Sequence, residues 1–381
     1  MPALAVADTW FNWRNRLLGS EAFRRWAARL PLVRWVARRR AAALFDLVAG
    51  FVYTQILQAC VRLRLFEILA EGPQNLEPLA HRLGLPPDAA QRLLAAAIAL
   101  KLVEERGPGR FGLGVLGAPL VGNTAITAMV EHHGVLYADL ADPVALLRGE
   151  ASSAHLAQYW PYATGQSPAG AQDVAAYSAL MSASQPLVAD EILDAYPLGR
   201  HRKLMDVGGG EGGFLMRVAE HAPHLDLVLF DLPPVAERAR LRLAQRGLAP
   251  RCQAVGGSFL TDALPRGADI ATLVRVVHDH NDDVVLRLLV AVREALLPGG
   301  TLLLAEPMAQ TPGAEAMGDA YFGFYLLAMG SGQPRSRKTL VAMLERAGFV
   351  GIRPIRTRMP LQTSLLFAQT PGVSKNPRSG L

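Results

Sequence analysis

Residues 204–213 read LMDVGGGEGG, an apolar run that ends at an aspartate and then breaks into a cluster of glycines. Glycine lets the backbone turn tightly and lets a ligand approach the main chain. Gly208, Gly210 and Gly213 match the pattern G-x-G-x-x-G, which joins a strand to a helix in nucleotide-binding domains. The stretch therefore predicts a loop for an adenosine-containing cofactor, either a nicotinamide dinucleotide or another nucleoside.

Two aspartates bear on the choice of cofactor: Asp231 is compatible with both alternatives, whereas Asp206 favours one of them. Asp231 ends the next predicted strand, where a carboxylate can accept hydrogen bonds from both hydroxyls of a ribose. Asp206 stands two residues before Gly208, where it would repel a pyrophosphate but can pair with the ammonium group of an amino-acid-like cofactor. We therefore favour S-adenosyl-L-methionine over a nicotinamide dinucleotide, which stays the alternative.

Strand and helix patterns alternate from residue 176 onward. Strands are predicted at 203–208, 226–232, 252–257, 269–277, 300–307, 352–358 and 364–370, and helices at 212–222, 234–247, 282–297 and 337–347. Because alternation of this kind is typical of parallel sheets covered on both faces, we expect an α/β fold over 176–370. The expected architecture is a doubly wound, Rossmann-like sheet, followed by a flexible tail at 371–381.

The length of 381 residues leaves room for a second domain, which we place at 46–175. Its patterns suggest a winged helix, with helices at 46–70, 76–85 and 88–100 and a hairpin within 103–116. Asp88 is expected to cap the last of these helices. Arg92 is the only cation on that helix, too few to read DNA bases or bind phosphates, so we expect a domain for packing or dimerisation and no nucleic-acid partner. A DNA-binding regulator stays a remote alternative.

The positive charge of the chain is confined to its first 40 residues. This arm has two acids and nine arginines, which are Arg14, Arg16, Arg24, Arg25, Arg29, Arg34, Arg38, Arg39 and Arg40. The net charge of this arm is +7, and since the net charge of the whole chain is +6, residues 41–381 have a net charge of −1. A nearly neutral body argues against an enzyme that acts on nucleic acid.

The same arm contains four of the five tryptophans, Trp10, Trp13, Trp26 and Trp35. Arginine mixed with tryptophan is typical of segments at a membrane–water boundary, so residues 1–40 either contact a membrane surface or pack on the body or a partner subunit. The apolar run at 41–61 is interrupted by Asp46, which is costly in lipid. We expect a cytoplasmic protein, soluble or peripheral at a membrane, and with only two distant cysteines no disulfide framework.

Several ordered motifs now make a resemblance specific. They are LMDVGGGEG at 204–212, FDLP at 230–233, GGSF at 256–259, RVVHDHND at 275–282, LLPGGTLLLAEP at 296–307 and RAGF at 346–349. The chain resembles the class I S-adenosylmethionine-dependent O-methyltransferases of the caffeate, acetylserotonin and hydroxyneurosporene type over most of residues 50–370. The resemblance implies a homodimer, S-adenosyl-L-methionine as methyl donor with S-adenosyl-L-homocysteine as product, and no metal.

The resemblance also implies which residues bind the donor. They are Asp206, Gly208, Gly210, Asp231, Leu232, Ser258, Phe259 and Arg275. Of these, Asp231 would contact the ribose, Phe259 would flank the adenine, and Arg275 would close the site. Plant relatives carry an acid at the position of Ser258. Met181 and Gln185 would touch cofactor and substrate from the preceding helix.

His278 is the predicted catalytic base, because it stands where an apolar strand breaks into a polar loop and matches the base of the family. Its alternative role is a structural cap. Glu306 matches one of two acids that flank the base in plant relatives and is expected to orient the imidazole. The second acid aligns near Pro334 and is missing, and His280 is expected to be a solvent-facing loop residue.

The acceptor is expected to be apolar. The uncharged segment 321–330 corresponds to the acceptor pocket of relatives, and Phe322, Tyr325 and Met329 are its predicted pocket residues, with ordinary core packing as the alternative. Together with the arm, this pattern resembles the carotenoid-modifying members of the family. That resemblance implies methylation of the tertiary 1-hydroxyl of an acyclic carotenoid, with a phenolic or polyketide acceptor as the alternative.

Overall fold

The computed structural model describes residues 2–150, 155–159, 185–360 and 363–372. These residues form two compact units, Met1–Asn123 and Thr124–Leu381, which are described separately. The predicted domain boundary after residue 175 therefore differs from the observed division. Helix α7 (Thr124–Asp139) belongs to the second unit, because its Leu136 packs in one apolar cluster with Tyr325 of that unit.

The first unit begins with three consecutive helices, α1 (Pro2–Gly19), α2 (Glu21–Arg29) and α3 (Pro31–Arg62). The side chain of Ser20 caps α2 by accepting a hydrogen bond from the backbone N–H of Phe23, and Pro31 opens α3. Helix α3 runs without a break through residue 46, where the second domain was predicted to begin. Its Val33–Arg62 stretch is long and apolar enough to cross a membrane by length and composition, and 17% of the tested window is buried.

The rest of the first unit is the winged helix that the sequence patterns predicted. It contains α4 (Leu65–Ala70), β1 (Gln74–Asn75), α5 (Leu76–Leu83), α6 (Pro87–Ala99), β2 (Val103–Glu105), β3 (Arg110–Leu113) and η1 (Ala118–Leu120). The three strands form a small sheet in the order β1-β3-β2. The expectation that Asp88 caps α6 is wrong, because Pro86 is the N-cap and Pro87 opens the helix, which leaves Asp88 in the first turn.

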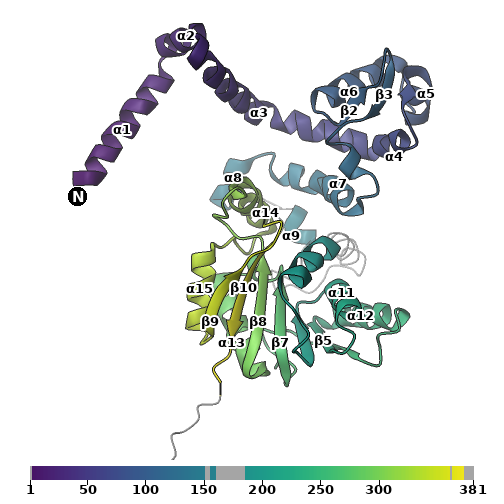
Figure 1. The fold of residues 1–381 in the computed structure, drawn as a ribbon, viewed down its shortest axis with the longest axis vertical. Helices are drawn as coiled ribbons and strands as arrows, with labels where there is room; N and C mark the ends of the chain where they lie inside the picture. The colour runs from purple at the N-terminus through teal and green to yellow at the C-terminus, as the bar shows by residue number, and fades with distance from the viewer. Residues whose placement is uncertain (1, 151–154, 160–184, 361–362, 373–381) are drawn as a thin grey trace, which may run out of the picture. The chain divides into compact units, whose positions relative to one another are not determined.

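The second unit is built on a seven-stranded sheet with the order β6-β5-β4-β7-β8-β10-β9 (Figure 1). Its strands are β4 (Lys203–Val207), β5 (Asp226–Asp231), β6 (Cys252–Gly256), β7 (Ala268–Val274), β8 (Leu296–Glu306), β9 (Val350–Ile355) and β10 (Ser364–Gln369). The predicted strands match these. The sheet is not wholly parallel, however, since β10 is antiparallel to both neighbours. Residues 356–363 are too short a connection for the crossover that parallel strands need.

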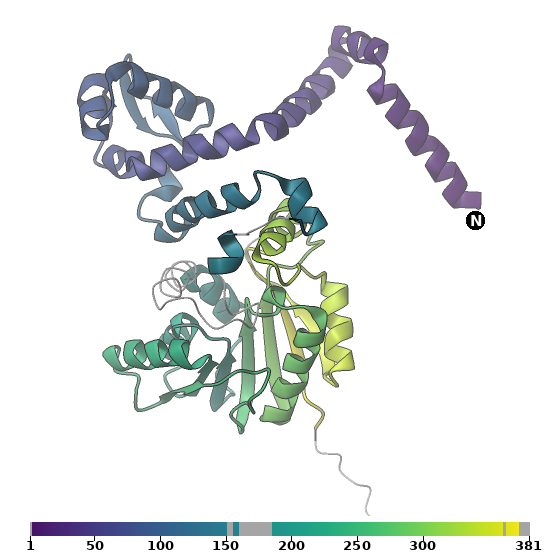
Figure 2. The ribbon, with the colours of Figure 1, turned by 180° about the vertical axis from the view of Figure 1, so that it is seen from behind.

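Helices cover both faces of this sheet, as predicted (Figure 1 and, from behind, Figure 2). Helices α13 (Asp282–Ala295) and α15 (Arg337–Arg346) pack on one face, and α11 (Gly213–His221) and α12 (Pro233–Gln245) pack on the other. Alternate residues of each strand serve the two faces: in β5, Val228 lies in the first cluster and Leu229 in the second. Both faces of the strands are therefore apolar, and polar groups gather at the strand ends.

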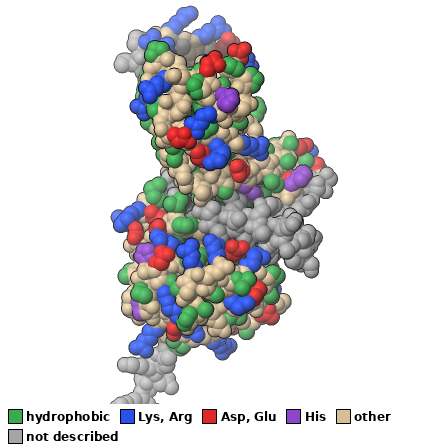
Figure 3. Space-filling view, turned by 90° about the vertical axis from the view of Figure 1, so that its right-hand side faces the viewer, with side chains coloured by type: hydrophobic (Ala, Val, Ile, Leu, Met, Phe, Trp, Pro, Cys, Tyr) green, Lys and Arg blue, Asp and Glu red, His purple; other side chains and the backbone are tan. Residues whose placement is uncertain are grey.

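A smaller helical group completes the second unit. It comprises α7, α8 (Pro143–Arg148), α9 (His155–Tyr159), the π-helix η3 (Ala316–Tyr321) and α14 (Phe322–Met329). No helix is predicted at 316–329 from the sequence, because this segment lacks the amphipathic period of a surface helix. On the face that Figure 3 shows, acidic and basic side chains are interspersed, as the nearly neutral body predicts.

Candidate functional site

The glycine loop lies over a buried carboxylate. Asp206, near the end of β4, is 1% exposed, and its Oδ1 accepts a hydrogen bond from Thr272 Oγ1 of the neighbouring strand at 2.6 Å. Its Oδ2 has no hydrogen-bond partner within the described part of the chain. Burial, together with the charge of Asp231, raises the pKa of Asp206 to about 7. An unsatisfied buried carboxylate oxygen is costly, so this atom fits a cationic ligand group.

The loop above Asp206 needs its glycines for two reasons. Gly208 and Gly210 have φ values of +71° and +57°, in the left-handed region that favours glycine. A Cβ on Gly209 would lie 2.7 Å from Asp206 Oδ2, so a side chain there would displace the carboxylate. A Cβ on Gly210 would meet no described atom within 4 Å, so the main chain is open on that side. A tight loop with one open side is what a nucleoside cofactor requires.

Asp231 ties the next strand end to the same loop. Its Oδ2 accepts a hydrogen bond from the N–H of Gly210 at 2.8 Å, and its Oδ1 accepts one from the N–H of Leu232 at 2.7 Å. Burial raises the pKa of Asp231 to about 6, although these two N–H groups act in the opposite direction. Each carboxylate oxygen has a second lone pair that can accept a ligand hydroxyl. The structure thus brings five predicted donor-binding residues together: Asp206, Gly208, Gly210, Asp231 and Leu232.

Ser258 and Phe259 lie in the turn after β6. Asp262 closes this turn, because its Oδ2 accepts a hydrogen bond from the N–H of Ser258 at 2.8 Å. The ring of Phe259 meets the ring of His280 edge to face, with 5.2 Å between centroids. The expectation that His280 faces solvent is wrong: it is half-buried, and burial lowers its pKa to about 4.

Arg275 links the loop after β7 to the helical segment 185–195. Its backbone has a left-handed φ of +56°, and its Nη2 donates a hydrogen bond to Gln185 Oε1 at 2.9 Å. The side chain of Gln185 also lies beside Gly213, since a Cβ there would be 3.3 Å from Gln185 Cγ. Gln185 is therefore adjacent to the glycine loop. Met181 lies outside the described residues.

The predicted base is held by a buried acid. His278 sits on the short 3₁₀ turn η2 (Val277–Asp279), and its Nδ1 lies 2.5 Å from Glu306 Oε2 at the end of β8. Glu306 Oε1 also accepts hydrogen bonds from the N–H groups of Val276 at 3.0 Å and Val277 at 2.7 Å. Glu306 therefore orients both the imidazole and the turn that carries it.

Asp279 is a neighbour of the imidazole that the sequence analysis did not assign. Its Oδ1 lies 3.2 Å from His278 Nε2, so carboxylates flank both ring nitrogens although the acid expected near Pro334 is missing. Burial lowers the pKa of His278, but the charges of Asp279 and Glu306 outweigh this effect and leave the pKa raised. Burial raises the pKa of Asp279 to about 6. The signal that could have revealed it is an acid directly after the candidate base.

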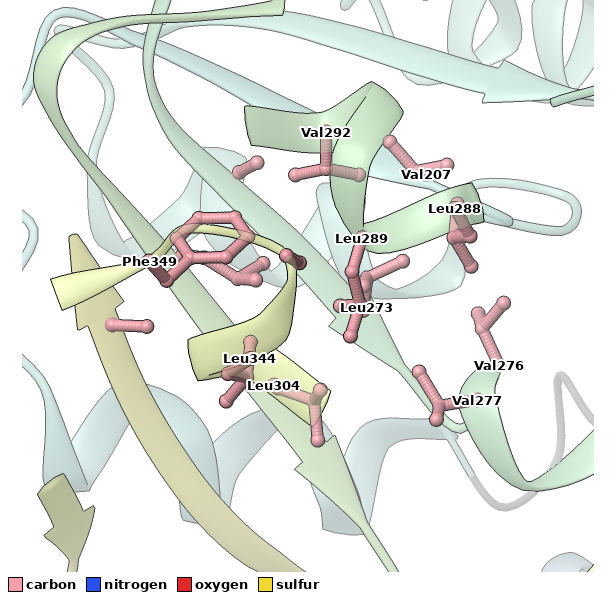
Figure 4. Close-up of a cluster of buried hydrophobic side chains, with 14 of the residues drawn as sticks. Val207, Leu273, Val276, Val277, Leu288, Leu289, Val292, Leu304, Leu344 and Phe349 are labelled. Carbon is pink, nitrogen blue, oxygen red and sulfur yellow. The ribbon is translucent and has the colours of Figure 1, made fainter. Parts of the chain in front are cut away.

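Apolar packing also holds the turn that carries His278. Figure 4 shows Val276 and Val277 in the buried cluster that also contains Leu288 and Leu289 of α13. Val276 also bounds the glycine loop, because a Cβ on Gly208 would lie 2.7 Å from Val276 Cγ2. The loop over Asp206 and the turn that carries His278 are thus in direct contact.

The three predicted acceptor-pocket residues differ in their surroundings. The ring of Phe322 lies edge to face against the imidazole of His278, with 5.7 Å between centroids. Tyr325 and Met329 are buried in the apolar cluster with Leu136 of α7, and Tyr325 OH lies 2.9 Å from His132 Nε2. Phe322 alone among the three directly contacts the candidate base in the described structure.

Within the described residues, no group of three or more His, Cys, Asp or Glu side chains is placed to hold a metal ion. The polar atoms at the site are instead those of an acid–histidine cluster beside a glycine loop. This arrangement can bind a cationic nucleoside and accept a proton.

Comparison with known protein families identifies the family to which the chain belongs. Residues 137–350 match the O-methyltransferase domain, and residues 45–126 match the O-methyltransferase dimerisation domain. Demethylspheroidene O-methyltransferase of Cereibacter sphaeroides is 46% identical over 357 residues, which cover 93% of this chain and 94% of that relative. The enzyme of the same name from Rhodobacter capsulatus is 44% identical, covering 94% of this chain and 89% of that relative.

Solved structures of similar fold are also methyltransferases. CalO1, a methyltransferase in calicheamicin biosynthesis, in its SAH-bound form, has a TM-score of 0.73 and 26% identity, covering 88% of this chain and 98% of that one. Human N-acetylserotonin methyltransferase in complex with SAM has a TM-score of 0.72 at 22% identity, covering 87% of this chain and 98% of that one, and shows the fold.

We predict that the affinity for S-adenosyl-L-methionine falls as the pH drops below about 7, by about tenfold per pH unit, because a neutral Asp206 cannot pair with an ammonium group. Asp206→Asn should weaken binding at least about tenfold at pH 8 and flatten the dependence above pH 6. Calorimetry across pH 6–8 measures both, with exposed Asp226→Asn as control. Equal binding by Asp206→Asn and the unsubstituted protein would exclude the proposed contact.

Proposed function

Since this chain belongs to the S-adenosyl-L-methionine-dependent O-methyltransferase family, we propose that it methylates the tertiary 1-hydroxyl of an acyclic carotenoid such as demethylspheroidene. The protein is a homodimer through its dimerisation domain. The observation that supports the acceptor is the 46% identity to a demethylspheroidene O-methyltransferase over nearly the whole of both chains. By contrast, mouse acetylserotonin O-methyltransferase is 30% identical.

The residues of the site suit such a transfer. When bound, S-adenosyl-L-methionine supplies an electrophilic methyl group. In our proposal Asp206 and the loop at Gly208 and Gly210 hold the amino-acid part of the donor, and Asp231 holds its ribose. His278 and Phe322 face the acceptor, one as base and the other as an apolar wall beside it.

His278 acts as the general base in this proposal. Its Nδ1–H donates to Glu306, so Nε2 carries the lone pair that takes the hydroxyl proton. The carboxylates of Glu306 and Asp279 then stabilise the imidazolium that forms. An alcohol is far less acidic than a phenol, whose pKa is about 10, so the proton leaves as the oxygen–methyl bond forms. The protein contributes proximity and orientation.

We also propose that the arm at residues 1–40 holds the enzyme at the cytoplasmic surface of a membrane, where an apolar acceptor dissolves. The indoles of Trp10, Trp13, Trp26 and Trp35 are 57%, 54%, 52% and 65% exposed. The nine arginines and two acids of the arm give it a net charge of +7, which suits anionic headgroups. Exposed tryptophan side chains suit the apolar part of a lipid interface, and the neighbouring arginines suit its anionic headgroups.

The identity of the acceptor can be tested by comparing candidate acceptors. With labelled donor, methyl transfer to demethylspheroidene in lipid vesicles should exceed transfer to N-acetylserotonin at least about 100-fold in kcat/KM, because a site built for one acceptor rejects a poorly fitting one. The same carotenoid without its hydroxyl is the negative control. Preferential methylation of the indole or of a simple phenol would reassign the acceptor and leave the reaction class intact.

The role of His278 as base can be tested by its removal. His278→Ala should reduce turnover by about 100-fold or more, the usual contribution of a positioned base, and leave donor affinity within a few-fold. Product formation and calorimetry measure the two effects, and the exposed His221→Ala is the matched control. Near-normal turnover of His278→Ala would show that another group removes the proton.

The membrane role of the arm can be tested with lipid vesicles. Replacing Trp10, Trp13, Trp26 and Trp35 by alanine in the full chain, or deleting residues 1–40, should weaken binding to anionic vesicles at least about tenfold, because interfacial indoles and cationic side chains are lost. Donor affinity should be unchanged. Vesicle sedimentation and calorimetry are the measurements. Vesicle binding that equals that of the unaltered protein would instead assign the arm to packing between subunits.

A further inference from the structure

A short segment bonds the backbone of the turn that carries His278. This segment, residues 331–335, which we name the strap, follows the end of α14 at Gly330 and precedes Ser336, the N-cap of α15. It donates hydrogen bonds to four consecutive backbone carbonyls of the turn. The pairs are Arg335 Nη1 to Val277 O at 2.8 Å, Gln333 N to His278 O at 2.9 Å, Ser331 Oγ to Asp279 O at 2.8 Å and Arg335 Nη2 to His280 O at 2.7 Å.

Arg335 is the centre of this arrangement. It is 4% exposed, and its two terminal nitrogens bond the carbonyls on either side of His278. Its Nε donates to Asp282 Oδ1 at 2.8 Å, at the start of α13. A planar guanidinium can donate in three directions at once, which a lysine ammonium on a flexible stem does not reproduce. A buried arginine used in this way fixes backbone geometry.

The strap also makes backbone contact with the turn. Gly332 has a φ of +80°, and a Cβ on it would lie 2.2 Å from the carbonyl oxygen of His278. A side chain at this position would therefore push the strap away from the base. Gly332 N donates to Asn281 Oδ1 at 3.1 Å, which extends the contact beyond the turn.

The turn makes few internal bonds, because it is a single 3₁₀ turn: the N–H of Asp279 donates to Val276 O at 3.3 Å, and the N–H of His280 donates to Val277 O at 3.4 Å. Glu306 accepts from the N–H groups of Val276 and Val277, whereas the strap donates to the carbonyls that follow. The backbone around His278 is thus bonded on both its donor and its acceptor sides. A shift of about 1 Å in a catalytic group can reduce the rate about 100-fold, so this double support bears on turnover.

We propose that Arg335 is a positioning residue, which holds His278 in its bond to Glu306 through the carbonyls of Val277 and His280. This inference rests on the proposed role of His278 as base. It also connects the base to the acceptor side of the site, because the strap continues directly from α14, whose Phe322 contacts the imidazole. Arg335 itself contacts neither donor nor acceptor in the proposal.

The test compares Arg335→Gln and Arg335→Lys with Arg337→Gln, an exposed arginine two residues further on. Arg335→Gln should lower kcat at least about 100-fold and leave KM and donor affinity within about threefold, because orientation and not binding is lost. Arg335→Lys should recover part of kcat, and Arg337→Gln should behave as the unsubstituted protein. A kcat of Arg335→Gln within threefold of normal would overturn the proposal, as would losses of kcat, donor affinity and thermal stability in parallel.

A spectroscopic readout reports on the positioning itself. The short bond from His278 Nδ1 to Glu306 should give a far-downfield proton resonance, absent in His278→Ala and in Glu306→Gln. It should be lost or broadened in Arg335→Gln and kept in Arg337→Gln. An unchanged resonance in Arg335→Gln would show that the imidazole stays in place without the guanidinium, against the proposal.

Two milder variants keep the test decisive if Arg335→Gln does not fold. Ser331→Ala removes one hydroxyl from the strap, and Asp282→Asn weakens the ion pair of Arg335. Each should lower kcat by about three- to tenfold, since one bond of the set is lost; normal kcat in both would overturn the proposal. His278→Ala distinguishes the base role of His278 from the positioning role of Arg335. If His278→Ala is inactive while the strap variants have normal kcat, only the positioning role is wrong. If His278→Ala is active, the base assignment is wrong.

Discussion

The site depends on one buried carboxylate that accepts three hydrogen bonds. Glu306 receives the N–H groups of Val276 and Val277 and the Nδ1 of His278, and it is nearly inaccessible to solvent. A buried carboxylate with fewer donors would be strongly destabilising, so the turn must stay where its donors reach Glu306. This requirement sets the position of the imidazole at the carboxyl edge of the sheet.

The same edge collects negative charge that matches the proposed donor. Asp206, Asp231, Asp279 and Glu306 all lie at or just after strand ends, and burial raises the pKa of the first three. Like charges in one low-dielectric region repel, so a cation bound among them is stabilised. S-adenosyl-L-methionine carries an ammonium and a sulfonium group, and an anionic pyrophosphate would be repelled. Charge alone therefore favours the methyl donor over a dinucleotide.

The features that could be predicted from the sequence are those encoded by a local pattern of residues. The strand–loop–helix at Asp206 and the carboxylates at strand ends could be placed because the sheet has a two-residue period and glycine marks the turn. Contacts made by segments distant in sequence could not: the bonds of Arg335 to the turn 277–280 span more than fifty residues. The packing of Tyr325 against α7 is likewise a contact between segments distant in sequence. It places α7 in the second unit, so the division lies after residue 123 and not after residue 175 as predicted.

The base is tuned by opposing effects, and their balance fits an alcohol acceptor. Burial of His278 among Phe322, Val276 and Val277 favours its neutral form, which is the form that accepts a proton. The two flanking carboxylates favour the protonated form and outweigh burial, so the imidazole is a stronger base than a free one. A phenol that is already partly acidic gains little from a stronger base, whereas a tertiary alcohol gains more, because its proton must be pulled away during methyl transfer. The carboxylates beside both ring nitrogens, together with the strap that fixes the turn, therefore suit a tertiary alcohol, which is the less acidic of the two acceptors.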